Sequence, residues 1–147
     1  MKKIQLHNQD EELKSLDSYL GKNLVLFFYP KDNTPGCTNE ATEFTGLLDE
    51  FKKYNTEVVG ISKDSIKSHQ NFISKRDLEV ELLSDPEGLL HKEFDVIKEK
   101  NVFGKIGLGT ERSTFVFNSD GELIKEFRKV KSKGHAQDVL NFIINEL

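Results

Sequence analysis

The chain has 147 residues, 36% of them hydrophobic and 31% charged, and a formal net charge of -4. This composition is typical of one ordinary soluble domain, so we expect a single domain over residues 1–147, and the acidic balance argues against nucleic acid as a partner. The first residues lack the apolar run of a signal peptide and no stretch approaches the ~20 apolar residues of a membrane span, so we expect a cytoplasmic location and no membrane partner.

Apolar runs and turn signals divide the chain into alternating strands and helices. Residues 23–29 (NLVLFFY) form a continuous apolar run that is too short for a buried helix, so they predict a buried central strand. The same reasoning predicts strands at 57–62, 81–84, 113–118 and 123–128, and helices at 35–53, 65–75, 86–94 and 135–147. We expect a glycine-containing loop at 102–110 and an Asp-Gly turn at 119–122 that joins the last two strands into a hairpin.

The order of these elements predicts the fold class. Strands alternate with helices in the first half, which implies parallel strands joined by crossover helices. The second half adds antiparallel pairing and a closing helix. We therefore expect an α/β fold with a mixed central sheet flanked by helices, as in thioredoxin-like proteins.

The only cysteine, Cys37, lies in the segment that follows the first long strand. One cysteine cannot form an internal disulfide and excludes CxxC motifs. Thr34 suits a helix N-cap and Pro35 the first helical position, so Cys37 falls at the third helical position. Uncapped N–H groups and the helix dipole favour an anion there, so we expect a thiol pKa below the ~8.5 of free cysteine. The thiolate is the nucleophilic form, which predicts a reactive residue.

The spacing of the following apolar residues predicts where the sulfur points. The residues at helical spacing after Cys37 are Ala41, Phe44, Leu48 and Phe51. Cys37 shares their inward face, so we expect the sulfur at the edge of the core and at the floor of a pocket. The alternative is that Cys37 is simply a small buried apolar side chain, and the residues alone leave both interpretations open.

The same segment resembles the peroxidatic-cysteine motif of peroxiredoxins. The motif Pro-x-x-x-Thr/Ser-x-x-Cys is met by Pro30, Thr34 and Cys37, and the string YPKDNTPGCTNE resembles the bacterioferritin-comigratory-protein (PrxQ) branch. The similarity continues through residues 60–62, 83–88, 104–105, 111–115 and 130–136, and so covers nearly the whole chain. It implies a thioredoxin-like fold and a thiol peroxidase that reduces hydrogen peroxide and organic hydroperoxides through a sulfenic acid at Cys37, without a cofactor.

The resemblance also implies roles for other residues. Thr34 would orient the peroxide, and Arg112 would stabilise the thiolate and polarise the peroxide oxygens. An arginine suits this role because it stays protonated and offers several donors in one plane, to which the amides of Gly36 and Cys37 add. Taken alone, Arg112 also fits a surface ion pair with its neighbour Glu111.

Four residues complete the expected pocket: Pro30, Gly36, Tyr29 and Glu40. Gly36 permits close approach to the backbone. Glu40 matches a family position, where we expect it to hold Arg112. Tyr29 suits either the pocket lining or the core.

The sequence departs from the family pattern at one position. Many members of this branch have a second, resolving cysteine five residues after the first, where this chain has Thr42. We therefore expect an external thiol, such as thioredoxin, glutaredoxin or a small thiol, to regenerate Cys37 in a monomeric protein. We also expect little unwinding of helix 35–53 on oxidation, since no second sulfur on it has to be reached.

Two other classes of function compete with this interpretation. A redox sensor or binding protein would use a reactive Cys37 without turnover. A cysteine hydrolase would need a histidine base, but His7, His69, His91 and His135 form no recognisable signature with Cys37. These histidines also lack the spacing of a metal site.

Overall fold

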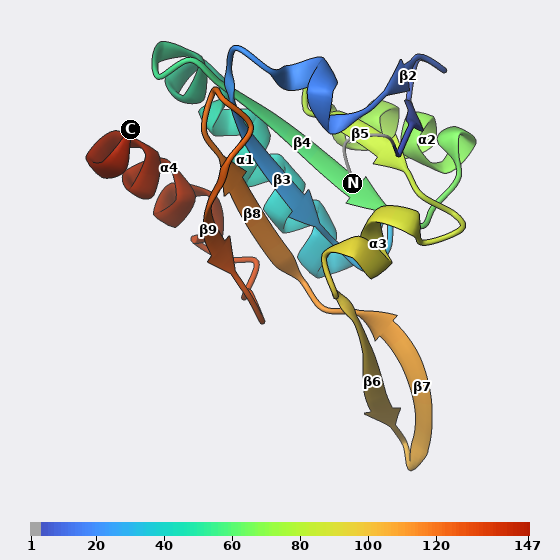
Figure 1. The fold of residues 1–147 in the computed structure, drawn as a ribbon. Coiled ribbons are helices and arrows are strands. Elements are labelled where there is room, and N and C mark those ends of the chain that lie inside the picture. The colour runs from blue at the N-terminus through green and yellow to red at the C-terminus, as the bar shows by residue number, and fades with distance from the viewer. Residues whose placement is uncertain (1–3) are drawn as a thin grey trace.

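The computed structural model describes residues 4–147, apart from the side chains of Lys100 and Val102. Its elements in chain order are β1 (Leu6–Asn8), β2 (Leu13–Lys14), the short 3-10 helix η1 (Leu16–Tyr19), β3 (Asn23–Phe28), α1 (Pro35–Lys53), β4 (Thr56–Ser62), α2 (Ile66–Arg76), β5 (Glu81–Ser84), α3 (Leu89–Glu93), β6 (Ile97–Val102), β7 (Lys105–Thr110), β8 (Ser113–Phe117), β9 (Leu123–Phe127) and α4 (His135–Glu146) (Figure 1).

Seven strands form one mixed sheet in the order β2-β1-β5-β4-β3-β8-β9. The three central strands β3, β4 and β5 are parallel, and α1 and α2 connect them in sequence. The strands β8 and β9 add to the β3 side as an antiparallel hairpin, and β1 pairs antiparallel with β5. This confirms the mixed α/β sheet that the order of elements predicts.

The two faces of the sheet have separate apolar cores because successive side chains of a strand point to opposite faces. Val25 and Phe27 of β3, and Tyr29 directly after it, pack against α1, α2 and α4. The alternate residues Leu24, Leu26 and Phe28 pack in a second core with residues of η1 and α3. The helix α1 therefore lies on the same face as α4, and its N-terminus stands where β3 ends.

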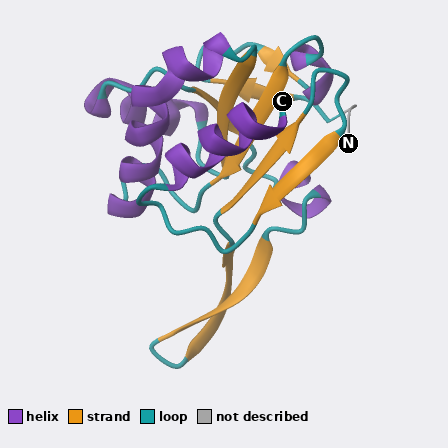
Figure 2. Cartoon of the chain, turned by 90° about the vertical axis from the view of Figure 1, so that its left-hand side faces the viewer, coloured by secondary structure: helices purple, strands orange, loops and turns teal. Residues whose placement is uncertain are grey.

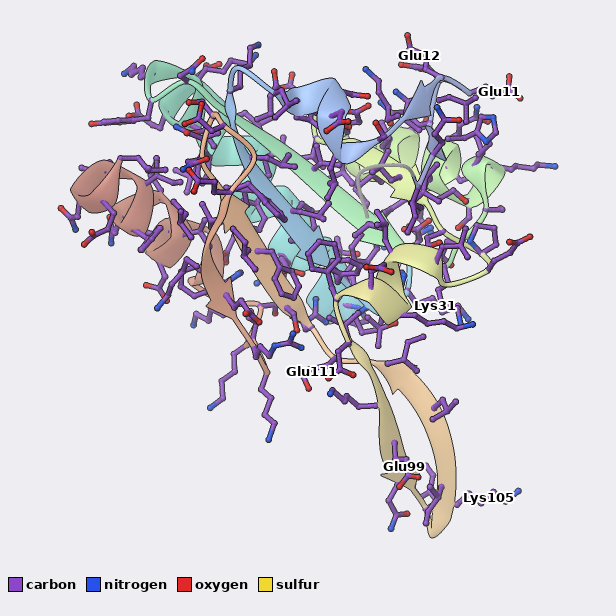
Figure 3. All side chains as sticks on the ribbon, in the orientation of Figure 1. Glu11, Glu12, Lys31, Glu99, Lys105 and Glu111 are labelled. Carbon is purple, nitrogen blue, oxygen red and sulfur yellow. The ribbon has the colours of Figure 1, made fainter. Side chains whose placement is uncertain are left out.

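The expected loop at 102–110 is wrong: β6 and β7 form a two-stranded hairpin outside the main sheet. It projects from the body of the molecule (Figures 1 and 2). Its turn is Phe103-Gly104, with φ values of 53° and 79°. Two positive φ values in a two-residue turn match the twist of the flanking strands, which favours a hairpin over a loop. Figure 3 shows Lys105 pointing away from the body near the tip and Glu111 where the hairpin joins the body.

The other departures from the predicted elements are smaller. The helix expected at 86–94 is shorter, because Asp85 to Gly88 form a turn in which the Gly88 amide donates to the Asp85 carbonyl at 2.9 Å and Gly88 has a φ of 70°. Helix α3 therefore begins only at Leu89. The elements β1, β2 and η1 are additional; two to four residues are too few for a periodic pattern. Within residues 4–147, no helix is long and apolar enough to cross a membrane.

Candidate active site

The segment between β3 and α1 places Cys37 in the first turn of a long helix. Helix α1 begins at Pro35 with Thr34 as its N-cap residue, so its bounds match the predicted ones and Cys37 is its third residue. The Thr34 side chain accepts no bond from the first turn; its hydroxyl donates to the Lys31 carbonyl at 2.7 Å. The hydroxyl's lone pairs remain as acceptors, and the first amides of a helix have no partner within the helix itself.

Cys37 faces inward, as the helical spacing predicts. It lies in one apolar cluster with Ala41, Phe44 and Phe51, and Leu48 packs at the margin of this cluster. Only 1% of Cys37 is exposed. The sulfur is therefore more deeply covered than the edge-of-core position expected from the sequence.

Arg112 connects the sulfur with a buried carboxylate. It stands just before β8, and its Nη2 donates to Cys37 Sγ at 3.5 Å while its Nη1 donates to Glu40 Oε1 at 2.7 Å. The alternative ion pair with Glu111 is wrong, because Glu111 instead lies 3.7 Å from Arg128. Glu40 thus contacts Arg112, which is the contact that its expected role of holding the arginine requires.

Burial dominates the electrostatics of this group of side chains. Glu40 is fully buried, and desolvation raises its pKa from 4.5 to about 7, although Arg112 acts in the opposite direction. Burial alone would lower the pKa of Arg112, but the neighbouring Glu40 and Cys37 outweigh it and raise that pKa above its ordinary value. The guanidinium therefore carries a permanent positive charge beside the sulfur.

Gly36 gives the guanidinium its room. A Cβ atom at this position would lie 3.0 Å from Arg112 Nη2 and 3.7 Å from Ser132 Oγ. The expected close approach to the Gly36 backbone is thus made by Arg112 itself. A larger residue would push the guanidinium from its place beside Cys37.

Tyr29 and Pro30 are neighbours in the chain with different surroundings: Tyr29 is buried and Pro30 is half-buried. Tyr29 is 1% exposed and packs in the cluster that contains Cys37, while its hydroxyl donates to Asp32 Oδ1 at 2.6 Å. Pro30 borders a cavity of about 500 Å³ at the base of the β6–β7 hairpin, together with Lys31 and Thr110. Sequence reasoning did not single out Asp32, although an acidic residue in the segment after a buried strand was a usable signal.

Three of the four histidines have a polar partner other than the sulfur of Cys37. His69 Nδ1 lies 2.7 Å from Asp32, His91 Nδ1 lies 2.6 Å from Asp85, and His135 Nε2 lies 2.7 Å from Thr114 Oγ1. Burial lowers the pKa of His135 to about 4. Within the described part of the chain, no histidine is bonded to Cys37, and no group of three or more His, Cys, Asp or Glu side chains is placed to hold a metal ion.

Comparison with protein families gives one match over most of the chain. Residues 1–126 match the model of the AhpC/TSA family. Peroxiredoxin Bcp of Xanthomonas campestris pv. campestris is 49% identical over 126 residues, which are 86% of this chain and 79% of that protein. Peroxiredoxin Bcp of Bacillus subtilis is 44% identical over 93% of this chain and 87% of its own length.

Comparison with solved structures agrees. A structure of the Xanthomonas campestris bacterioferritin comigratory protein, from work on its alkyl peroxide reduction activity, superposes with a TM-score of 0.94 at 43% identity, covering 98% of this chain and 92% of that one. Peroxidoxin BcpB of Mycobacterium tuberculosis gives a TM-score of 0.85 at 31% identity, covering 98% and 93%. This chain, with its thioredoxin-like fold, belongs to the AhpC/TSA family and within it to the Bcp (PrxQ) peroxiredoxins, the thiol peroxidases that reduce hydroperoxides through a peroxidatic cysteine.

Proposed function

We propose that Cys37 is the peroxidatic residue and that Arg112 and Thr34 are its catalytic partners. The Cys37 thiolate attacks one peroxide oxygen, the O–O bond breaks, and two electrons pass from sulfur to the peroxide. Cys37 keeps one oxygen as a sulfenic acid. The other oxygen takes up a proton and leaves as water from hydrogen peroxide, or as an alcohol from an organic hydroperoxide.

The observation that carries this proposal is the position of the Arg112 guanidinium between Cys37 Sγ and Glu40. Negative charge moves from the sulfur to the leaving oxygen as the O–O bond breaks. A fixed cation within reach of both atoms stabilises that charge throughout, and a donor that is already in place needs no reorganisation during the reaction. Glu40 acts through Arg112 and is a positioning residue.

Thr34 and the first turn of α1 supply the remaining contacts. Since the Thr34 hydroxyl gives its hydrogen to the Lys31 carbonyl, its lone pairs accept the hydrogen of the incoming peroxide. The amides of Gly36 and Cys37 donate to the oxygen atoms. Pro30, Gly36, Tyr29 and Glu40 complete the pocket, with Tyr29 as a part of its inner wall.

The substrates in this proposal are hydrogen peroxide and organic hydroperoxides. The Xanthomonas campestris relative reduces alkyl peroxides, which supports the organic class for this chain as well. A cytoplasmic location fits the single cysteine, because reducing compartments do not favour disulfide-bonded proteins.

An external thiol regenerates Cys37 in this scheme, because the chain has no second cysteine. The first thiol displaces the sulfenic oxygen as water and forms a mixed disulfide. A second thiol attacks that disulfide, releasing Cys37 as a thiol and the reductant as its own disulfide. Thioredoxin, glutaredoxin and small thiols all supply this chemistry, and the burial of Cys37 favours a monomer over a disulfide between two chains.

Peroxide turnover with a panel of reductants tests the proposal. Wild type is expected to consume many equivalents of peroxide per Cys37 with at least one of thioredoxin, glutaredoxin or a small thiol, and Cys37→Ser none above background. One equivalent of oxidation at Cys37 without turnover by any reductant would instead identify a redox sensor. Unchanged consumption by Cys37→Ser would refute the role of Cys37.

A further inference from the structure

A buried polar network lies beside the active-site loop, residues 29–34, which carries Thr34 and leads to Cys37 in the first turn of α1. At its centre is the carboxylate of Asp32, whose side chain is 1% exposed. Its Oδ1 accepts the Tyr29 hydroxyl at 2.6 Å, and its Oδ2 accepts the Ser68 hydroxyl at 2.8 Å. The same Oδ2 lies 2.7 Å from Nδ1 of His69, a fully buried residue of α2. Every contact binds the loop to an element that is distant in the sequence or to the end of β3.

The network extends to the ends of the two neighbouring parallel strands. The Asp32 amide donates to Asp64 Oδ2 at 2.8 Å, and that carboxylate also accepts the Ser62 hydroxyl at 2.7 Å. On the other side, His69 Nε2 lies 2.8 Å from the Leu83 carbonyl. The active-site loop is thereby anchored to β4, to α2 and to β5.

The hydrogen-bonding partners fix the protons of His69. A backbone carbonyl only accepts, so Nε2 must carry a hydrogen toward Leu83. One proton then lies between Nδ1 and Asp32 Oδ2, and the pair is neutral as a whole whichever atom holds it. The lone pairs of Asp32 are filled by hydroxyl donors, which makes the pair a satisfied unit inside the protein.

We propose that His69 and Asp32 are positioning residues for the peroxide reaction: they hold the loop so that Thr34 and the first turn of α1 meet the peroxide in line with Cys37. This inference rests on the proposed role of Cys37. Asp32 is only two residues before Thr34, and Thr34 is bonded back to the carbonyl of Lys31. A displacement of about 1 Å at the reacting atoms is enough to lower a rate about 100-fold.

The chain contains a matched control for this pair. His91 and Asp85 form a second buried histidine–aspartate pair, with a distance of 2.6 Å between Nδ1 and Oδ2. His91 belongs to α3 and packs edge-on against Phe28, on the opposite face of the sheet from Cys37. Replacing His91 therefore removes a comparable contact between a buried histidine and a buried aspartate, and this contact does not involve the active-site loop.

Two replacements of His69 separate a positioning role from general packing. The amide nitrogen of His69→Gln reaches the place of Nε2 and keeps the Leu83 contact, whereas that of His69→Asn reaches the place of Nδ1 and keeps the Asp32 contact. Two rate constants are measured for each variant and for His91→Gln: oxidation of Cys37 by hydrogen peroxide and alkylation by iodoacetamide. Quenched samples are read by mass spectrometry, and circular dichroism confirms the folded state.

We expect His69→Gln to oxidise about 10- to 100-fold more slowly than wild type, with a much smaller change in alkylation. Cys37 in His69→Asn is expected to be oxidised about tenfold faster than in His69→Gln. In His91→Gln it is expected to be oxidised at the wild-type rate. If His69→Gln does not fold, Tyr29→Phe, which removes one donor to Asp32 without adding an unpaired charge, is expected to slow oxidation about threefold or more.

Equal oxidation rates in wild type and His69→Gln, or equal losses in His69→Gln and His69→Asn, overturn the positioning role. So does a wild-type rate in Tyr29→Phe if that variant has to be used. A failure of the proposed function gives a different result in wild type alone: Cys37 is then either not oxidised by peroxide, or oxidised once and not returned to the thiol by any reductant.

Discussion

Replacement of Glu40 by glutamine is expected to make the protein more stable and less active. Burial raises the pKa of Glu40 from 4.5 to about 7. The folded state therefore holds a proton that the unfolded chain has lost between these pH values, and stability falls as the pH rises through this window. At about 1.4 kcal/mol per pKa unit, the ionised carboxylate costs about 3 kcal/mol above pH 7. The attraction of Arg112 is already included, because it opposes the rise in that pKa.

Glutamine resembles the protonated carboxyl group in shape and charge, so Glu40→Gln avoids this cost. We expect it to exceed wild type by about 1–3 kcal/mol in urea unfolding at pH 8, with the difference disappearing as the pH falls to 4.5. A neutral acceptor fixes Arg112 less firmly than a carboxylate does. Oxidation by hydrogen peroxide should therefore slow about tenfold, less than the ~100-fold lost when a donor is removed outright. A variant less stable than wild type at pH 8 would refute the reasoning, since pairing with Arg112 would then outweigh burial.

Three further predictions concern the helix and its surroundings. Gly36→Ala places a Cβ 3.0 Å from Arg112 Nη2 and should slow peroxide oxidation severalfold, whereas Gly46→Ala, with open space on the same helix, should leave that rate unchanged and add about 1 kcal/mol of stability in thermal unfolding. Burial lowers the pKa of His135 from 6.5 to about 4, so the free energy of unfolding of wild type should rise by about 3 kcal/mol between pH 4 and pH 6.5. His135→Gln should not show this rise, and urea unfolding at both pH values measures it. Hydrogen exchange in α1 should change little on oxidation of Cys37, because no second sulfur on this helix has to be reached; a wide loss of protection would contradict the expectation that the helix stays folded.

The main strands and helices could be predicted because local pattern and tertiary burial agree in them. The run from Leu24 to Phe28 is apolar on both faces of the strand, and both faces of β3 are in fact covered. The N-cap, proline and helical spacing around Cys37 likewise determine α1 to the residue. The hairpin of β6 and β7 was missed because the side chains of β7 are largely exposed, so its apolar residues follow no burial pattern.

The sequence predicts which residues form the candidate site, but it does not predict the contacts between them. The motif identifies Thr34 and Cys37, and the wider resemblance adds Arg112. Arg112 is 75 positions from Cys37 in the sequence, and the pairing of β8 with β3 brings the two together. The bond from Thr34 to the Lys31 carbonyl and the network around Asp32 depend on atoms that no local pattern specifies.

The central claim is that Cys37 itself is oxidised by peroxide and then returned to the thiol. The most direct measurement treats the reduced protein with one equivalent of hydrogen peroxide, locates the added oxygen by mass spectrometry, and then adds a thiol. The account predicts one added oxygen at Cys37, its complete removal by the thiol, and the same cycle on repeated additions. Oxygen found elsewhere, or an unmodified Cys37 while peroxide disappears, would contradict it.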